Sequence, residues 1–458
     1  MVTLAARLIE KRHSTVHNWA RTVHSSPAVV VRPTSQDELL RILKDDDAYP
    51  SPVRAMGHFH STTPCAASDG GTIVDMTALD RIIEIGANHV TVEGGAEYLA
   101  VQRALVEKGL HFFVDLQIGN VTLGSLATCD TKDAAWPENF GQLGAYVTHI
   151  KLALVSGEVL EVDERNSHLF RAVRSSYGLL GLVLEVTFRV EPMRSVGIRH
   201  ESYSFEGFVD ALPELMTRNG SLMMYFFPFA DRIIVQLRRP GDPRSWRNPL
   251  VWRLRNLGVA YLMPLVARFT NLVRIATVRY LLQQFFNALS RLILVQFLHA
   301  RNTRPSEQTT DYPQRSRQLS FTFSIFAFPA RDYPEILLAF REFCWSYYNV
   351  TSYRPDLLSV GYYVRQCDYS LFSYSADGDV LTIDPVASGG PEWDAFAVAF
   401  NEFCVARGGK PLFNQTPALT PAQVRRSFGT RVDQFNVVRK QLDPGNRLLN
   451  DYFAHLLG

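Results

Sequence analysis

Residues 53–64, VRAMGHFHSTTP, decide how the first part of this chain is interpreted. The apolar run at 53–56 predicts a short strand, and a tight loop from Gly57 to Ser61 follows it, ahead of a Thr-Thr-Pro turn. Successive backbone N–H groups in such a loop can hold an anion without a positive side chain. The stretch therefore predicts either a phosphate-binding nest after a strand or a plain turn with incidental histidines.

The two histidines of this loop do not indicate a metal site. His58 and His60 could supply only two ligands, whereas a metal site would want further His, Asp or Glu partners at a regular spacing. The sequence holds no HExxH motif and no second histidine cluster. We expect no metal.

Bulk composition narrows the class of protein. The 458 residues suggest about two domains, and 47 basic against 45 acidic residues give no electrostatic reason to expect a nucleic-acid partner. Five scattered cysteines form no CxxC pair, which argues against a disulfide framework or a zinc site and favours a reducing compartment. The N-terminal residues lack an apolar core of secretory length, so a cytoplasmic location is expected.

The order of short strands and helices indicates an α+β fold. Residues 28–34, AVVVRPT, predict a strand, and Ser35 then begins an amphipathic helix with a capping box. Residues 145–162 predict a hairpin around Ser-Gly, and Pro192 is a candidate domain edge. A second run of strands and helices follows.

The apolar stretch 250–300 is broken by arginines every turn or two. No uninterrupted run in it is long enough for a spanning helix. Two interpretations stay open: a pair of buried helices, or an amphipathic surface that contacts a membrane or an apolar substrate. The interrupting residues in its central part are Arg268, Arg274, Arg279 and Arg291.

The 53–64 loop, the preceding NWARTVHSSPAVVVRPTSQDELLRIL and the final LDPGNRLLNDYF together resemble the aldonolactone and alditol oxidases, within the vanillyl-alcohol oxidase or PCMH-type FAD-binding superfamily. The apolar stretch is similar to an insert in gulonolactone oxidases. The resemblance covers nearly the whole chain. It implies a PCMH-type FAD-binding domain at 1–192, an α+β substrate (cap) domain at 193–420 with the 250–300 insert, and a helical tail at 421–458 that packs back on the FAD domain.

The resemblance also implies the cofactor site. FAD would be bound, and the covalent link that is frequent in this family would here join His60 to the flavin 8α-methyl group. Gly57, His58, Phe59 and Ser61 would give N–H groups to the pyrophosphate, with Phe59 where the family usually has glycine. A second flavin segment at 117–131 would use Gly119, Gly124, Ser125, Thr128 and Thr131, and Gly178 and Gly181 would line the adenine side. Cys129 is expected to be a packing residue rather than a second tether.

For the substrate end, the family pattern of an acid and an arginine on one strand falls on Tyr363 and Arg365. Alternation would put both on one face, where they would act on the substrate hydroxyl; a packed tyrosine with a structural arginine is the alternative. Gln415 stands where the family has lysine, Leu412 replaces a histidine, and Ser125 would lie near the reacting hydroxyl. These changes predict a less polar pocket.

Three functions remain open on this basis. The first is hydride transfer from a CH–OH of a sugar-derived alcohol or lactone to flavin N5, with reoxidation by O2 or another acceptor. The second is a tailoring oxidation of a larger apolar alcohol, phenol or secondary metabolite. The third is a non-catalytic flavoprotein on a membrane surface, with residues 250–300 as its peripheral contact.

Overall fold

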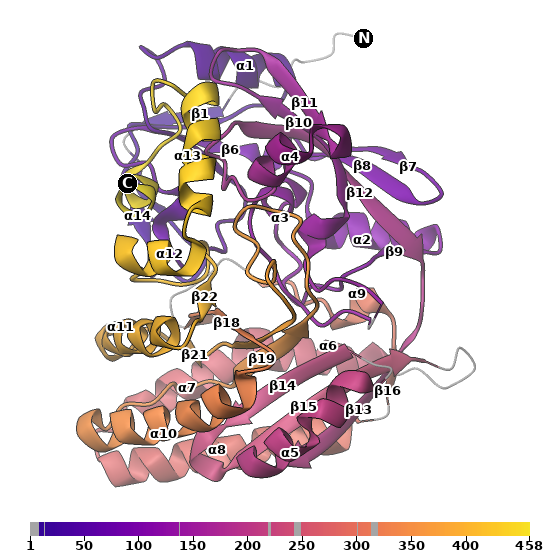
Figure 1. Ribbon diagram of the computed structural model, residues 1–458, viewed down its shortest axis with the longest axis vertical. Helices are drawn as coiled ribbons and strands as arrows, with labels where there is room; N and C mark the ends of the chain where they lie inside the picture. The colour runs from indigo at the N-terminus through magenta and orange to yellow at the C-terminus, as the bar shows by residue number, and fades with distance from the viewer. Residues whose placement is uncertain are drawn as a thin grey trace.

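Figure 1 shows the computed structural model of the chain. The structure describes residues 9–12, 14–136, 138–218, 221–241, 249–299, 301–312 and 319–458. Two small sheets and their helices form one end of the molecule, and one large sheet with helices on both faces forms the other. This is the expected α+β fold.

The first sheet places the 53–64 loop. Its strand order is β1-β4-β6-β5, and β6 pairs in parallel with both β4 and β5. Val29, Val31 and Val53 are fully buried in it, and α1 begins at its Ser35 cap as predicted. β5 is an outer strand of this sheet, and the loop from Gly57 to Ser61 begins at its carboxyl end. The elements are β1 (Ile9–Arg12), β4 (Val29–Arg32), α1 (Gln36–Lys44), β5 (Val53–Met56) and β6 (Thr72–Asp75).

The second sheet has the order β11-β10-β12-β8-β7, with β9 paired to the end of β12. The predicted hairpin is confirmed, since β10 and β11 pair antiparallel around Gly157 at φ 78°. Helices α2, α3 and α4 accompany this sheet. The elements are β7 (Ile82–Ile85), β8 (His89–Glu93), α2 (Tyr98–Glu107), β9 (Leu110–Phe112), α3 (Leu123–Thr128), β10 (Val147–Ala153), β11 (Val159–Asp163), α4 (Ser167–Val173) and β12 (Leu182–Pro192).

The large sheet is antiparallel and has the order β16-β13-β15-β14-β19-β20-β18-β22. Helices α5 and α10 lie on the near face of this sheet in Figure 1. Its first strand along the chain, β13, begins four residues after Pro192, where the sequence predicts a domain edge. The elements are β13 (Val196–Tyr203), α5 (Phe205–Thr217), β14 (Ser221–Phe227), β15 (Arg232–Pro240), β16 (Arg301–Thr303), β18 (Phe326–Pro329), α10 (Tyr333–Thr351), β19 (Ser359–Val364), β20 (Val380–Ile383), α11 (Pro391–Ala406) and β22 (Lys410–Pro411).

The apolar insert is helical and lies on the far face of the large sheet in Figure 1. It consists of α6 (Pro249–Leu257), a π-helical turn at 258–262, α7 (Met263–Asn271) and α8 (Ala276–Phe297), and α9 (Pro305–Gln308) follows it. Within the part of the chain that is described, no helix has the length and apolar character needed to cross a bilayer.

The last helices return to the first sheet. Asn450 donates to the carbonyl oxygens of Pro64 (3.0 Å) and Ala67 (2.8 Å), directly behind the 53–64 loop. The helices are α12 (Pro421–Phe428), α13 (Arg431–Leu442) and α14 (Asp451–Leu457). Two short strand pairs complete the fold: β2 (Val16–His17) with β3 (His24–Ser25), and β17 (Thr322–Phe323) with β21 (Val386–Ala387).

Candidate active site

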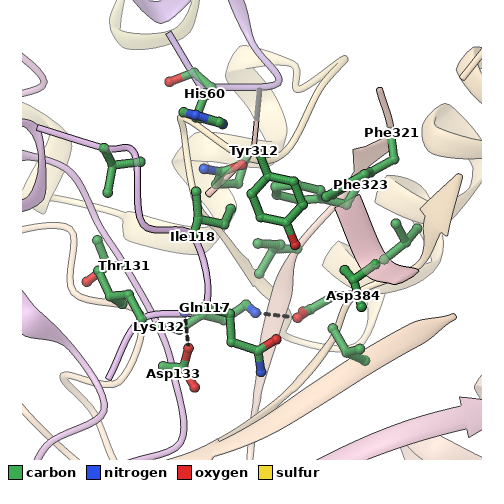
Figure 2. A pocket seen from close by; sticks show the side chains of 18 of the residues that line it. His60, Gln117, Ile118, Thr131, Lys132, Asp133, Tyr312, Phe321, Phe323 and Asp384 are labelled. Carbon is green, nitrogen blue, oxygen red and sulfur yellow. Dashed lines mark hydrogen bonds and ion pairs between the residues drawn. The ribbon is translucent and has the colours of Figure 1, made fainter. Parts of the chain in front are cut away.

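A cavity of about 1030 Å³ lies between the two halves of the molecule. One wall comes from the loop after β5, from α3 with the segment after it, and from residues 177–183. The other comes from β14, β19 and the insert helices. Figure 2 shows its centre, with the His60 ring at one end and the Lys132 and Asp384 side chains at the other.

The loop after β5 exposes backbone donors to this cavity. Among the described residues, none accepts a hydrogen bond from the backbone N–H groups of Phe59, His60 and Ser61. The Phe59 and Ser61 carbonyls are fixed from behind, by the Trp19 N–H (2.8 Å) and the Asn18 amide (2.9 Å). A loop held in this way has the unbonded N–H donors that an anion-binding nest needs.

Two positions of the loop favour glycine, one because there is no space for a side chain and the other because of its backbone conformation. A Cβ on Gly57 would lie 2.5 Å from Thr122 Oγ1, which is closer than atoms can pack. Phe59 has φ 52°, in the left-handed region that favours glycine, and its side chain is buried. The family's usual glycine at this position is therefore matched by backbone conformation, although the side chain differs.

His60 has the environment that a cofactor link would need. Its ring stacks on Trp19, with centroids 5.5 Å apart and an interplanar angle of 24°. Its Nε2 is buried and has no hydrogen-bond partner among the described residues. Burial, assisted by nearby His58 and opposed by hydrogen bonding to Asn120, lowers the pKa of His60 to about 3, so the imidazole is neutral.

Most of the other predicted cofactor residues line the same cavity. Gly124 lies against Gly94, where a Cβ would be 2.6 Å from the Gly94 carbonyl oxygen. Gly119 is the exception: it does not line the cavity, because its N–H donates to the Thr310 carbonyl (2.8 Å) and its α-carbon packs on the Thr309 side chain. The residues brought together are Gly57, His58, Phe59, His60, Ser61, Gly124, Ser125, Thr128, Thr131, Gly178 and Gly181.

Buried polar groups support this wall from behind. The fully buried Arg54 donates to the carbonyls of Cys65 (2.7 Å), Tyr177 (2.5 Å) and Leu448 (2.7 Å). Asp130 accepts from the Tyr177 hydroxyl (2.7 Å), and burial raises the pKa of Asp130 to about 7. Sequence reasoning missed both residues, although a charged residue inside the apolar run VRAM is a visible signal.

Cys129 lies in the cavity wall as a thiol. Burial raises the pKa of Cys129 well above its ordinary value, with Cys65 and Asp130 acting in the same direction. A protonated thiol is a poor nucleophile, which agrees with a packing role.

The predicted catalytic pair Tyr363 and Arg365 does not line the cavity. Tyr363 donates its hydroxyl to Asp379 (2.6 Å), and the Arg365 guanidinium lies 5.9 Å from the Phe140 ring centroid. Tyr363 lies on β19, and Arg365 is the first residue after that strand. Alternation predicts which residues share a face without saying which face meets the site.

The opposite face of β19 meets the cavity instead. Tyr362 pairs with Met223 of β14, and both line the cavity together with Val360 and Tyr225. A shift of one position along the strand thus separates the predicted face from the observed one.

A buried ion pair that sequence reasoning missed joins the two walls of the cavity. Lys132 pairs with Asp384, and the Lys132 Nζ lies 3.9 Å from the centroid of the Tyr362 ring (Figure 2). Burial raises the pKa of Asp384 to about 6, while Lys132 opposes the rise. Lys132 directly follows the predicted flavin segment 117–131, and Asp384 directly follows the apolar strand β20. A charged residue at the end of each segment was the signal available in the sequence.

Gln415 also lines the cavity, and its buried Oε1 has no hydrogen-bond partner among the described residues. Ser125 lies nearby on α3 and exchanges a hydrogen bond with Thr122 (2.8 Å). Elsewhere the cap wall is apolar, with side chains of α6, α7 and α8. Across the described residues, no three His, Cys, Asp or Glu side chains are grouped to hold a metal ion.

Comparison with known proteins agrees with this geometry. A family profile described as FAD binding domain matches residues 27–163, and the profile of the D-arabinono-1,4-lactone oxidase family matches residues 186–456. An L-gulono-1,4-lactone dehydrogenase from Mycobacterium tuberculosis is 25% identical over 96% of this chain and 98% of its own length. An L-gulonolactone oxidase from Mus musculus is 24% identical over 95% and 96%.

Solved structures show the same fold at lower identity. A cholesterol oxidase from B. sterolicum superposes with a TM-score of 0.75 at 13% identity, and a solvent-stable cholesterol oxidase with 0.75 at 14%. Each comparison covers 98% of both chains. The fold is therefore a PCMH-type FAD-binding domain with a second α+β domain. The chain belongs to the D-arabinono-1,4-lactone oxidase family and is an FAD-dependent oxidoreductase that acts on CH–OH donors.

Proposed function

We propose that the chain oxidises the CH–OH carbon of a lactone or sugar-derived alcohol in the cavity between its two halves. The observation that supports this most is that one cavity contains both His60, on one wall, and the Lys132–Asp384 pair, which joins the two walls. A cofactor anchor and a buried acid–base pair are the two parts that such a reaction needs.

The residues of the first wall fit FAD. The N–H groups of Phe59, His60 and Ser61 would hold the pyrophosphate, and the close backbone approaches at Gly57 and Gly124 would leave room for the flavin. FAD supplies the redox chemistry, since its N5 takes a hydride from carbon and the electrons then pass to O2 or another acceptor.

His60 would also bind FAD covalently through the flavin 8α-methyl group. The new imidazole N–C bond replaces one methyl C–H bond and one imidazole N–H bond, and two protons and two electrons leave with an acceptor such as O2. The neutral, buried imidazole with its free Nε2 supports this link.

The cap side would handle the hydroxyl proton. Asp384, ionised above a pH of about 6, would take that proton. Lys132 would stabilise the negative charge that develops on the substrate oxygen as the proton leaves. Gln415 and Ser125 would position the substrate hydroxyls. Tyr363 and Arg365 are not assigned a catalytic role, because of where they lie.

A second substrate class is supported by the cap wall. Apolar side chains of the insert line the outer part of the cavity, which favours an alcohol with a large apolar group over a free sugar. We also propose a cytoplasmic location and a peripheral membrane contact through residues 250–300.

One experiment tests the cofactor proposal. The purified chain, expressed with ample riboflavin, should keep its yellow colour after acid precipitation, and His60→Ala should lose colour under acid while still binding FAD in neutral buffer. Colour that washes off the wild-type chain would contradict the link, and a colourless chain would contradict FAD binding.

Substrate class is tested by anaerobic mixing with L-gulono-1,4-lactone and with dodecanol. A substrate bleaches the flavin absorbance. Bleaching by the lactone supports the first class and bleaching by dodecanol the second. If no hydroxyl compound of either kind bleaches the flavin, the non-catalytic alternative is favoured.

A further inference from the structure

The insert helices expose an unusual amount of apolar surface. Sixteen of the 23 large apolar side chains that are exposed among the described residues belong to residues 249–298. Leu272, Ile275 and Leu281, around the turn between α7 and α8, are 75%, 65% and 60% exposed. Water-soluble surfaces rarely gather apolar side chains in this way unless something covers them.

The exposed surface is continuous with the cavity. Eight of the sixteen side chains also line the cavity, among them Phe269 at 71% and Phe285 at 70% exposure. The cavity therefore opens through the insert, and its mouth is rimmed by apolar side chains. A ligand that enters here passes from the exposed apolar surface of the insert to the apolar wall of the cavity.

The charge of the insert selects the partner. Residues 249–298 contain six arginines and no aspartate or glutamate. Arg253 and Arg274 are exposed, and Arg279 is half-buried and donates to the Ser352 carbonyl. Two copies of the chain packed through this surface by a two-fold axis would bring arginines against arginines. A bilayer with anionic headgroups matches both the charge and the apolar side chains.

We propose that the insert docks peripherally on an anionic bilayer and that the cavity is loaded from it with an apolar hydroxyl compound. The loading part rests on the proposed function, in its second substrate class. The bilayer is the one occupant assigned to the surface, and the apolar groups around Leu272 to Leu281 enter it while the arginines meet lipid phosphates. The cavity mouth then faces the acyl chains.

Vesicle sedimentation of the flavin-loaded full chain tests the docking. Vesicles with about 30% phosphatidylglycerol should bind it at least about tenfold better than pure phosphatidylcholine vesicles, and added salt should weaken the binding. The triple variant Leu272→Ser/Ile275→Ser/Leu281→Ser should lower binding at least about tenfold. The double variant Arg253→Gln/Arg274→Gln should lower it on anionic vesicles only.

A matched control changes exposed apolar residues elsewhere. Val350, Val398 and Val437 are 86%, 47% and 58% exposed and lie outside the insert. Their triple serine variant should bind vesicles like the wild type. The docking proposal is overturned if anionic vesicles do not bind the wild type, if both triple variants lose binding equally, or if sedimentation equilibrium shows a dimer that only the insert variant dissociates.

Loading is tested with pyrene-labelled dodecanol carried in the same vesicles. After flotation, the wild-type chain should retain about one pyrene per flavin, as expected for one cavity. Phe285→Gln/Leu289→Gln, at the mouth, should retain at least about fivefold less while still binding vesicles. No retained pyrene, or equal retention by the mouth variant, overturns loading from the bilayer.

The two proposals fail in different ways. Bleaching of the flavin by a water-soluble lactone needs no vesicles and should be the same in the insert variant and the wild type. Loss of vesicle binding with normal bleaching overturns only the docking. Normal docking and pyrene retention without any bleaching overturns only the oxidation.

Discussion

The two walls of the cavity are built by different means. The wall that fits FAD is made of backbone N–H groups, close-packed glycines and a fully buried arginine, Arg54. The wall on the cap side is made of apolar side chains on the insert, many of them exposed, and its Asp384 pairs with Lys132 of the other wall. A rigid backbone wall suits one fixed cofactor, whereas a wall of side chains can change with the substrate.

The largest expected effect separates the two faces of β19. Asp384→Asn should lower kcat by about a hundredfold or more, because it removes the proposed proton acceptor from the cavity. Asp379→Asn is the matched control, since Asp379 accepts from Tyr363 on the opposite face. It should change kcat by less than about threefold. Steady-state rates at pH 8 measure both, and equal losses would contradict the assignment of the faces.

The next effect concerns how the cap wall responds to pH. Since the pKa of Asp384 is raised to about 6, kcat/KM should rise with pH through that value as the carboxylate forms. Lys132→Met removes the positive neighbour that lowers this pKa, so the rise should move to higher pH, and Lys132→Arg should restore it. A profile that Lys132→Met leaves in place would refute a catalytic role for the pair.

Alanine substitutions compare the packing of the two walls directly. Gly57→Ala should lower the free energy of unfolding by about 1–3 kcal/mol and reduce FAD content, because its Cβ would collide with Thr122. Gly258 lines the cavity from the insert, and a Cβ there meets no atom within 4 Å. Gly258→Ala should be neutral or stabilise by up to about 1 kcal/mol. Denaturant unfolding of both variants tests the contrast, which fails if they behave alike.

The smallest effect lies inside the FAD wall. Because burial raises the pKa of Asp130 from 3.8 to about 7, the stability that its neutral form gives is lost as the pH rises to about 7. Above that pH the Tyr177 hydroxyl donates to a carboxylate, so Tyr177→Phe should cost about 2 kcal/mol at pH 8 and about 1 kcal/mol at pH 5.

Tyr374→Phe is the control for this pH dependence. Its hydroxyl donates to the Thr131 carbonyl (2.8 Å), which does not titrate, so its cost in unfolding free energy should be the same at pH 5 and pH 8. A pH-dependent loss in Tyr374→Phe, or a constant one in Tyr177→Phe, would contradict the role of Asp130.

Sequence reasoning predicted the features that depend on local pattern. The strand and loop at 53–64, the hairpin at 145–162 and the helical insert all follow from residue type and spacing. The gathering of the flavin segments around one cavity followed from the family resemblance, with Gly119 as the exception. These features are set by short stretches of chain.

The cap side could not be predicted in the same way. Alternation put Tyr363 and Arg365 on one face, but the choice of face depends on how β19 docks against β14 and the insert. Lys132 and Asp384 are 252 positions apart in the sequence, and only the folded chain brings them together. The resemblance also directed attention to the family's positions, three of which carry other residues here, namely Tyr363, Leu412 and Gln415.

The hydrogen bond from Arg54 to the Leu448 carbonyl joins positions 394 residues apart. During synthesis, the Arg54 guanidinium behind the 53–64 loop therefore cannot form this hydrogen bond until almost all of these residues have left the ribosome. Until then the Arg54 side chain on β5 lacks one of its hydrogen-bond acceptors. We expect cofactor capture to be a late, post-translational event, and nascent chains stalled before Leu448 to stay colourless when riboflavin is abundant.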